Sequence, residues 1–282
     1  MSADYHRPKE LQAALDILAR DTPRIAAGCT DLFPATERKI LPGPVLDITA
    51  IPALRGITRG DDGLRIGATT TWADIIRADL PPAFDGLKLA AREVGAKQIQ
   101  NQGTIAGNLC NASPAADGVP PLLTLDASVE VASAQGLRQI PLHTFILGPR
   151  RIDLRPGEMV TAIIVPENAL TGRGHFLKLG ARDYLVISIA MTAARITLEE
   201  GIVQQAALAI GSCGPVATRL PELEARLIGK PLDTHLITNE EVADHLSPID
   251  DMRADAGYRA SSAAELLRRT LTDLSEPQEA AA

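Results

Sequence analysis

The feature that most constrains the fold of this chain is residues 96–118, AKQIQNQGTIAGNLCNASPAADG, which are rich in Gly, Asn, Gln, Ser and Ala. The stretch shows little amphipathic periodicity, so it predicts an ordered but irregular loop rather than a helix or a strand. Long irregular loops inside compact domains are often functional. We therefore expect this segment to belong to a binding site.

Short helices and strands surround this loop. Apolar residues at three- and four-residue spacing predict a helix over residues 8–20, and Thr71 with Asp74 forms a capping-box pattern that opens another. The mixture indicates a mixed α/β class, with the best domain boundary at the Pro- and Gly-containing residues 166–174. Further helical patterns cover residues 87–94, 221–227 and 254–274, and short apolar runs predict strands over residues 24–27, 45–48, 64–67, 129–131, 159–165, 176–179, 189–198 and 203–210.

Length and charge narrow the class of protein. At 282 residues the chain suits two or three modest domains. Its formal charge of −7 and pI near 5.3 lack the basic footprint that nucleic acid and anionic membranes select. No apolar run reaches the roughly 20 residues of a membrane span, and residues 1–5 lack a basic-then-apolar export pattern. We expect a cytoplasmic protein that binds neither nucleic acid nor membranes.

The cysteines argue against several kinds of site. Cys29, Cys110 and Cys213 are far apart, form no CxxC pair and belong to no Cys/His cluster at metal-ligand spacing. The HExxH, GxSxG and P-loop motifs are also missing from the sequence. We expect no metal site and no catalytic residue, so the chemistry must come from an organic cofactor or from a partner.

Two Gly-containing turns are candidates for binding phosphate. Residues 28–31 (GCTD) follow a predicted strand, and residues 103–108 (GTIAGN) lie within the long loop. Either turn alone also fits an ordinary β-turn or loop. Two donor-rich turns together suit a pyrophosphate, because a doubly charged group removed from water needs several hydrogen bonds. No GxGxxG follows a strand, so a dinucleotide here needs a fold other than the Rossmann fold.

These turns carry a family resemblance. IAAGCTDL at 25–32 and GTIAGNLCNASPAADGVPPLL at 103–123 resemble the two FAD loops of the molybdenum hydroxylase flavoproteins, the xanthine dehydrogenase and carbon monoxide dehydrogenase type. The resemblance covers nearly the whole chain. It extends to YHRP at 5–8, RIGATTTWADI at 65–75, GEMV at 157–160, FLKLGARD at 176–183 and AIGSCGPVATR at 209–219.

The resemblance implies an α+β architecture. It predicts a two-subdomain, PCMH/VAO-like FAD-binding fold, followed by a small domain of a three-stranded antiparallel sheet and helices. The expected FAD-binding subdomains are residues 1–58 and 59–168. The expected C-terminal domain is residues 174–275, with a tail at 276–282.

The resemblance also implies which residues bind FAD. The backbone of the first loop and the side chains of Thr104 and Asn108 would hold the pyrophosphate, and Gly107 would permit close approach. Asp117 would accept a ribose or ribityl hydroxyl, although a helix N-cap is the alternative role. The full expected set is Ala26, Ala27, Gly28, Cys29, Thr30, Asp31, Leu32, Thr104, Ile105, Gly107, Asn108, Asp117, Val160 near the isoalloxazine edge and Lys178 near the flavin.

The chain departs from the family pattern at three positions. Ala27 and Ala106 stand where the loops often have Gly, so neither position adopts a positive φ without strain. Val94 stands where some relatives stack an aromatic residue on adenine. We expect a lower affinity for FAD from these changes, but no loss of a phosphate donor.

The implied function is electron transfer. In such complexes a large molybdenum-cofactor subunit oxidises the substrate and a small subunit passes electrons through iron-sulfur clusters. The flavoprotein then hands the electrons to an acceptor, which is NAD, oxygen or a carrier protein. Two alternatives remain: a freestanding FAD oxidoreductase of the same superfamily, which would need a proton donor beside the ring, and a flavin-free scaffold, which degraded loops would favour.

Overall fold

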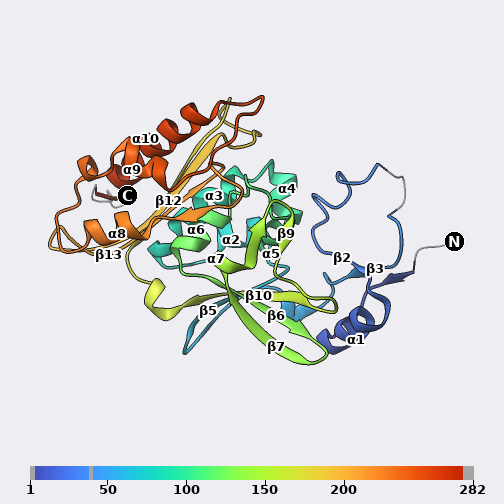
Figure 1. Ribbon diagram of the computed structural model, residues 1–282. Helices are drawn as coiled ribbons and strands as arrows, with labels where there is room; N and C mark the ends of the chain where they lie inside the picture. The colour runs from blue at the N-terminus through green and yellow to red at the C-terminus, as the bar shows by residue number, and fades with distance from the viewer. Residues whose placement is uncertain (1–3, 38–40, 276–282) are drawn as a thin grey trace.

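The computed structural model describes residues 4–37 and 41–275 (Figure 1). The N-terminal part is a small parallel sheet with strand order β1-β3-β2. Helix α1 packs Ala14, Leu15 and Leu18 against Leu46 of β3, as the apolar spacing in the sequence predicts. These elements are β1 (Tyr5–His6), α1 (Leu11–Asp21), β2 (Arg24–Ala26) and β3 (Val45–Asp47).

The middle part is an antiparallel sheet with strand order β4-β5-β10-β6-β7. Ile66, Val129 and Ile163 from this sheet join Trp72 and Leu109 from the helices in one core. The strands are β4 (Ile57–Gly60), β5 (Gly63–Gly67), β6 (Ser128–Ser133), β7 (Gly136–Pro141) and β10 (Met159–Pro166). The helices are α2 (Trp72–Arg77), α3 (Asp85–Glu93), α4 (Lys97–Gln102), α5 (Ile105–Asn111), α6 (Val119–Thr124) and α7 (Leu142–Phe145), and a hairpin of β8 (Ile146–Gly148) and β9 (Arg151–Ile152) follows.

The C-terminal part is an antiparallel sheet, β11-β12-β13-β14, covered by helices (Figure 1). The expected hairpin at residues 199–201 is confirmed, with Glu200 and Gly201 both in the left-handed region. The three expected strands are present, and the first is longer than predicted. A two-residue fourth strand lies at the edge of the sheet. The elements are β11 (Arg173–Leu179), β12 (Ala190–Glu199), β13 (Ile202–Gly211), β14 (Thr218–Arg219), α8 (Pro221–Leu227), α9 (Asn239–Asp244) and α10 (Ala256–Ser275).

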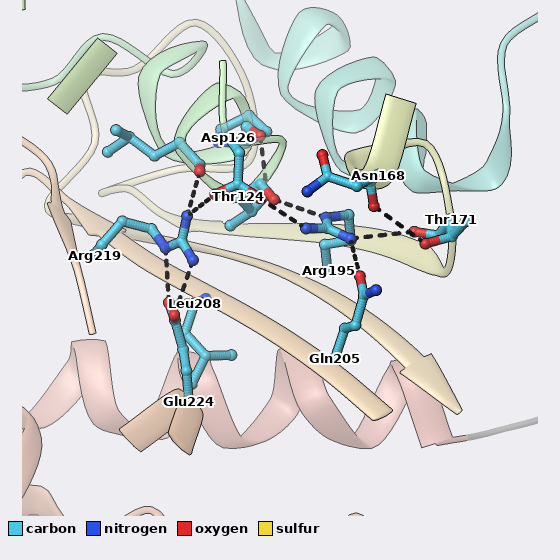
Figure 2. A network of polar contacts seen from close by, with 11 residues as sticks. Thr124, Asp126, Asn168, Thr171, Arg195, Gln205, Leu208, Arg219 and Glu224 are labelled. Atoms are coloured by element: carbon cyan, nitrogen blue, oxygen red, sulfur yellow. Dashed lines mark hydrogen bonds and ion pairs between the residues drawn. The ribbon is translucent and has the colours of Figure 1, made fainter. Parts of the chain in front are cut away.

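Polar contacts join the C-terminal sheet to the middle part. Figure 2 shows Arg195 of β12 and Arg219 of β14 both reaching Asp126, which follows α6. Arg195 also donates from Nε to the Thr124 carbonyl at 2.8 Å, and Arg219 pairs with Glu224 at 2.7 Å. These contacts fix the C-terminal sheet against the end of α6.

The prediction of an irregular loop over residues 96–118 is wrong in part, because this segment contains α4 and α5. Both helices are short, which explains their weak periodicity. Thr104 caps α5 by accepting a hydrogen bond from the Gly107 N–H at 3.1 Å. Trp72 packs beside Gly103, so a cap and tertiary packing stabilise the segment.

Within residues 4–37 and 41–275, no helix is long and apolar enough to cross a membrane. The same residues contain no group of three His, Cys, Asp or Glu side chains placed to hold a metal ion.

Candidate functional site

A cavity of about 810 Å³ lies between the loop after β2, the α4–α6 segment and the loop after β11. Its volume is typical of small-molecule and cofactor sites. Most of the expected cofactor residues line it. They are Ala27, Gly28, Cys29, Thr30, Asp31, Leu32, Thr104, Gly107, Asn108, Asp117 and Val160.

The two predicted phosphate loops meet at this cavity. A Cβ atom added to Gly28 would lie 1.9 Å from the carbonyl oxygen of Gln102, and one added to Gly103 would lie 3.4 Å from Thr30 Oγ1. The backbone of Gln102 and Gly103 therefore leaves no room for a side chain at position 28. Gly28 thus permits a close approach between the two loops, a role that the sequence does not predict for it.

The first loop presents unused backbone donors. Among the hydrogen bonds within the described residues, none uses the N–H of Cys29, Thr30 or Asp31. Cys29 has φ +58°, so the left-handed position of this loop is occupied by a cysteine. Ala27, where relatives often have glycine, does not need a positive φ. Consecutive free N–H groups in a turn of this kind are suited to an anion.

The second loop contributes side-chain groups. Because Thr104 Oγ1 accepts a hydrogen bond from Gly107, its own hydroxyl proton remains available to a ligand. Asn108 Oδ1 is buried and has no hydrogen-bond partner in the described part of the chain. Rotation of the amide presents Nδ2 as a donor at the same place. A buried amide oxygen without a partner at a cavity wall makes Asn108 a candidate ligand contact.

Asp117 lies in a buried polar cluster at the cavity wall. Lys178 Nζ lies 2.8 Å from Asp117 Oδ2, and the Ser188 hydroxyl donates to Asp117 Oδ1 at 2.8 Å. Burial raises the pKa of Asp117, and the ammonium of Lys178 opposes this change. The N-cap role is excluded, because α6 begins at Val119 behind Gly118 and has no side-chain cap.

Val160 lines the cavity at an irregular point of β10. The register of β10 against β6 shifts between Val160 and Ala162, which is the signature of a β-bulge. Bulges often re-aim side chains next to functional sites. Val94, at the end of α3, also lines the cavity, in the position where some relatives have an aromatic residue.

Three of the expected residues do not line the cavity. Ala26 belongs to β2, and Ile105 is fully buried, with its N–H donating to the Thr70 carbonyl at 3.0 Å. Lys178 reaches the cavity only through Asp117. For these residues, as for the expected residues that line the cavity, a direct contact with a cofactor remains a prediction.

Sequence reasoning missed several lining residues. Trp72, Glu93 and Arg150 line the cavity, together with residues 185–187 of the loop after β11. Burial raises the pKa of the Glu93 carboxyl. Gly148-Pro149 predicts a turn directly before Arg150. Nothing local identifies residues 185–187, because the fold brings them in from a distant segment.

Comparison with known proteins identifies the family. Residues 1–168 match the family described as the FAD binding domain in molybdopterin dehydrogenase, and residues 175–274 match the CO dehydrogenase flavoprotein C-terminal domain. The chain belongs to the flavoprotein subunits of the molybdopterin dehydrogenases. The expected family and its FAD-binding domain are therefore confirmed.

Individual relatives agree over nearly their whole length. The xanthine dehydrogenase FAD-binding subunit of Escherichia coli O157:H7 is 31% identical over 280 residues, covering 96% of this chain and 95% of the relative. The glyceraldehyde dehydrogenase medium chain of Sulfolobus acidocaldarius is 33% identical over 263 residues, covering 90% and 92%. Carbon monoxide dehydrogenase from Hydrogenophaga pseudoflava superposes with a TM-score of 0.86 at 27% identity, covering 97% of both chains. The chain is thus an oxidoreductase subunit with the expected fold.

Proposed function

We propose that this chain is the electron-transfer flavoprotein of a molybdenum hydroxylase complex and that it holds FAD in the 810 Å³ cavity. The observation that carries the proposal is the meeting of two donor-rich loops at this cavity. In this proposal residues 1–58 and 59–168 form the FAD-binding subdomains and residues 174–275 form the C-terminal domain. The tail at 276–282 lies outside the described residues.

The residues present fit the charged part of FAD. The free N–H groups of residues 29–31 and the hydroxyl of Thr104 would donate to the pyrophosphate. The Asn108 amide, which has no partner in the described structure, would complete this set. Such charge-assisted bonds replace the hydration that the phosphates lose on burial.

The cavity also fits the uncharged parts of FAD. Asp117 uses one oxygen for Lys178 and the other for Ser188, and a carboxylate retains further lone pairs for a ribose or ribityl hydroxyl. Val160 and Leu154 provide an apolar wall for the ring. When bound, FAD supplies the ability to accept electrons singly and release them in pairs, while the protein tunes the potential.

The partners follow from this role. A large molybdenum-cofactor subunit would oxidise the substrate, and a small iron-sulfur subunit would pass electrons to the flavin. The external acceptor would be NAD, oxygen or a carrier protein. Support comes from relatives whose names describe them as subunits or medium chains of dehydrogenases, such as the carbon monoxide dehydrogenase medium chain of Hydrogenophaga pseudoflava.

Flavin content tests the proposal directly. The purified chain is expected to contain FAD or to take it up on incubation, with the visible absorbance of a bound flavin after removal of free FAD. A chain that stays colourless after incubation would contradict the proposal and support a flavin-free scaffold. FAD loading together with substrate oxidation by the lone chain would instead support a freestanding oxidoreductase.

A further inference from the structure

Arg150 is the one basic side chain that lines the cavity within residues 4–37 and 41–275. The acidic side chains Asp31, Glu93 and Asp117 line the same cavity. Of these, Asp117 is paired with Lys178. Arg150 is therefore the principal source of positive charge on the cavity wall itself.

The position of Arg150 is tightly determined. It follows Gly148 (φ +155°) in the turn of the β8–β9 hairpin and has φ +60°, which is uncommon for a residue with a side chain. Its N–H donates to the Ala112 carbonyl at 2.9 Å, and Nη1 donates to the Asn111 carbonyl at 3.0 Å. Nη1 also contacts Asn111 Oδ1. Residues with such a backbone conformation cluster at ligand sites, although Arg150 itself is exposed.

The helix α5 places Arg150 relative to the phosphate loops. Thr104 caps one end of α5 and Asn111, which binds Arg150, is at the other end. Seven residues at a rise of 1.5 Å per residue separate these ends by about 10 Å. If the pyrophosphate lies at Thr104, as the proposed function requires, a flavin ring that extends along α5 would come within reach of Arg150. Val160 and Leu154 line the same cavity and would give that ring an apolar surface.

The guanidinium has hydrogen-bonding capacity left over. Nη1 makes the contacts with Asn111, and no partner for Nε or Nη2 occurs in the part of the chain that the structure describes. An arginine retains its charge at every physiological pH. Reduction increases the negative charge on a flavin ring, so a fixed cation beside the ring favours the reduced form.

We propose that Arg150 is a potential-tuning residue, which stabilises the reduced flavin and so raises the midpoint potential of FAD in this subunit. This inference rests on the proposed function. It assigns a role in the electron relay to the turn between β8 and β9. It also separates two tasks along α5: binding of FAD at the Thr104 end and tuning of its potential at the Asn111 end.

The test compares three variants of the full chain loaded with FAD. Arg150→Gln keeps a hydrogen-bond donor for Asn111 but removes the charge, and Arg150→Lys keeps the charge. Arg151→Gln removes the same charge from the next residue, which is exposed and does not line the cavity. The midpoint potential is measured by equilibrium titration against a reference dye, and the FAD dissociation constant is measured in parallel.

We expect Arg150→Gln to bind FAD within a few fold of the wild type and to have a more negative potential. Arg150→Lys and Arg151→Gln should stay close to the wild-type potential. Equal potentials in Arg150→Gln and Arg151→Gln would overturn the inference. Complete loss of FAD from Arg150→Gln would also overturn it, because Arg150 would then be a binding residue. A wild-type chain without FAD would instead contradict the proposed function.

Discussion

Trp72 and Asn108 both lie close to Gly118, the residue that follows Asp117. A Cβ atom added to Gly118 would lie 2.5 Å from Trp72 Cη2 and 2.9 Å from Asn108 Oδ1. The indole, the Asn108 amide and the Gly118 backbone are thus in close contact beside Asp117. Because Trp72 is 1% exposed, it has little freedom to move away from a new neighbour.

The first prediction concerns Asn108. Asn108→Leu should weaken FAD binding about 10- to 150-fold, since losing a hydrogen bond to a charged group costs about 1.5 to 3 kcal/mol. Titration of the apo chain with FAD measures the effect. Asn101→Leu is the control, because Asn101 is exposed on α4 and does not line the cavity. Equal affinities in the two variants would remove Asn108 from the site.

The second prediction concerns Gly118. Its φ of −75° is compatible with alanine, so the effect of Gly118→Ala should come from the clash with Trp72. We expect a loss of about 1 to 3 kcal/mol in the free energy of unfolding in urea, as for other overpacked sites. Gly60→Ala is the control, because a Cβ atom at Gly60 would meet no described atom within 4 Å. Equal losses in the free energy of unfolding would show that contact with Trp72 does not destabilise Gly118→Ala.

At the scale of the element, α2 and α5 are both short helices that begin with a threonine cap. The sequence predicts the cap of α2, and both capping-box hydrogen bonds between Thr71 and Asp74 are present. The helix α5 is not predicted, although Thr104 caps it in the same way. The difference is that the residues around Thr104 lack amphipathic spacing, and contacts with Trp72 from a separate segment compensate.

The third prediction separates the two roles of Thr104. Thr104→Val should lose the cap of α5, at about 0.5 to 2 kcal/mol, and should also bind FAD more weakly. Thr238→Val is the matched control, because Thr238 caps α9 in the same way and does not line the cavity. Both variants should lose stability in urea, but only Thr104→Val should lose affinity. Weakened FAD binding in both would indicate a general loss of folding.

Much of the site is predictable from sequence, because it depends on local chemistry. The glycines, threonines and Asn108 of the two loops are within short motifs, and the structure brings these loops together at Gly28. Arg150 and residues 185–187 are not predictable in the same way. They reach the cavity through the hairpin β8–β9 and the C-terminal sheet, so their positions depend on tertiary contacts.

At the scale of the whole molecule, hydrogen bonds and ion pairs connect the C-terminal part to the cavity wall. Lys178 and Ser188 bind Asp117 at the cavity wall, and the Ser212 N–H donates to the Pro114 carbonyl at 3.1 Å. At the other end of α6, Asp126 forms ion pairs with two arginines of the sheet, Arg195 and Arg219 (Figure 2). The C-terminal part therefore supports the wall of the proposed flavin site.

The fourth prediction concerns this connection. Asp126→Asn should keep the backbone conformation at φ +49°, which asparagine tolerates, but should remove the charge that faces Arg195. Arg195 is buried but Asp126 is 43% exposed, so we expect a loss of about 1 to 2 kcal/mol in urea unfolding. Glu167→Gln, which alters the exposed pair with Arg59, is the control and should cost less. Equal losses would contradict a special role for the Asp126 contacts.

The fifth prediction concerns the chain without its partners. The lone chain should contain FAD, should contain no stoichiometric iron or molybdenum, and should hydroxylate nothing, although its flavin should exchange electrons with small dyes. Cys29, Cys110 and Cys213 are separate free thiols, and burial raises the pKa of Cys110 and of Cys213 to about 12, which disfavours the thiolate that a metal cluster needs.

Metal analysis and assays of the lone chain beside the reconstituted complex test this prediction. In the complex, substrate should reduce the flavin, because the iron-sulfur subunit would connect it to the molybdenum site. Removing the iron-sulfur subunit alone should stop flavin reduction by substrate while dye reduction through the flavin continues, since the dye needs only access to the cavity. Substrate hydroxylation by the lone chain, or stoichiometric molybdenum in it, would contradict the relay and favour a complete enzyme on one chain.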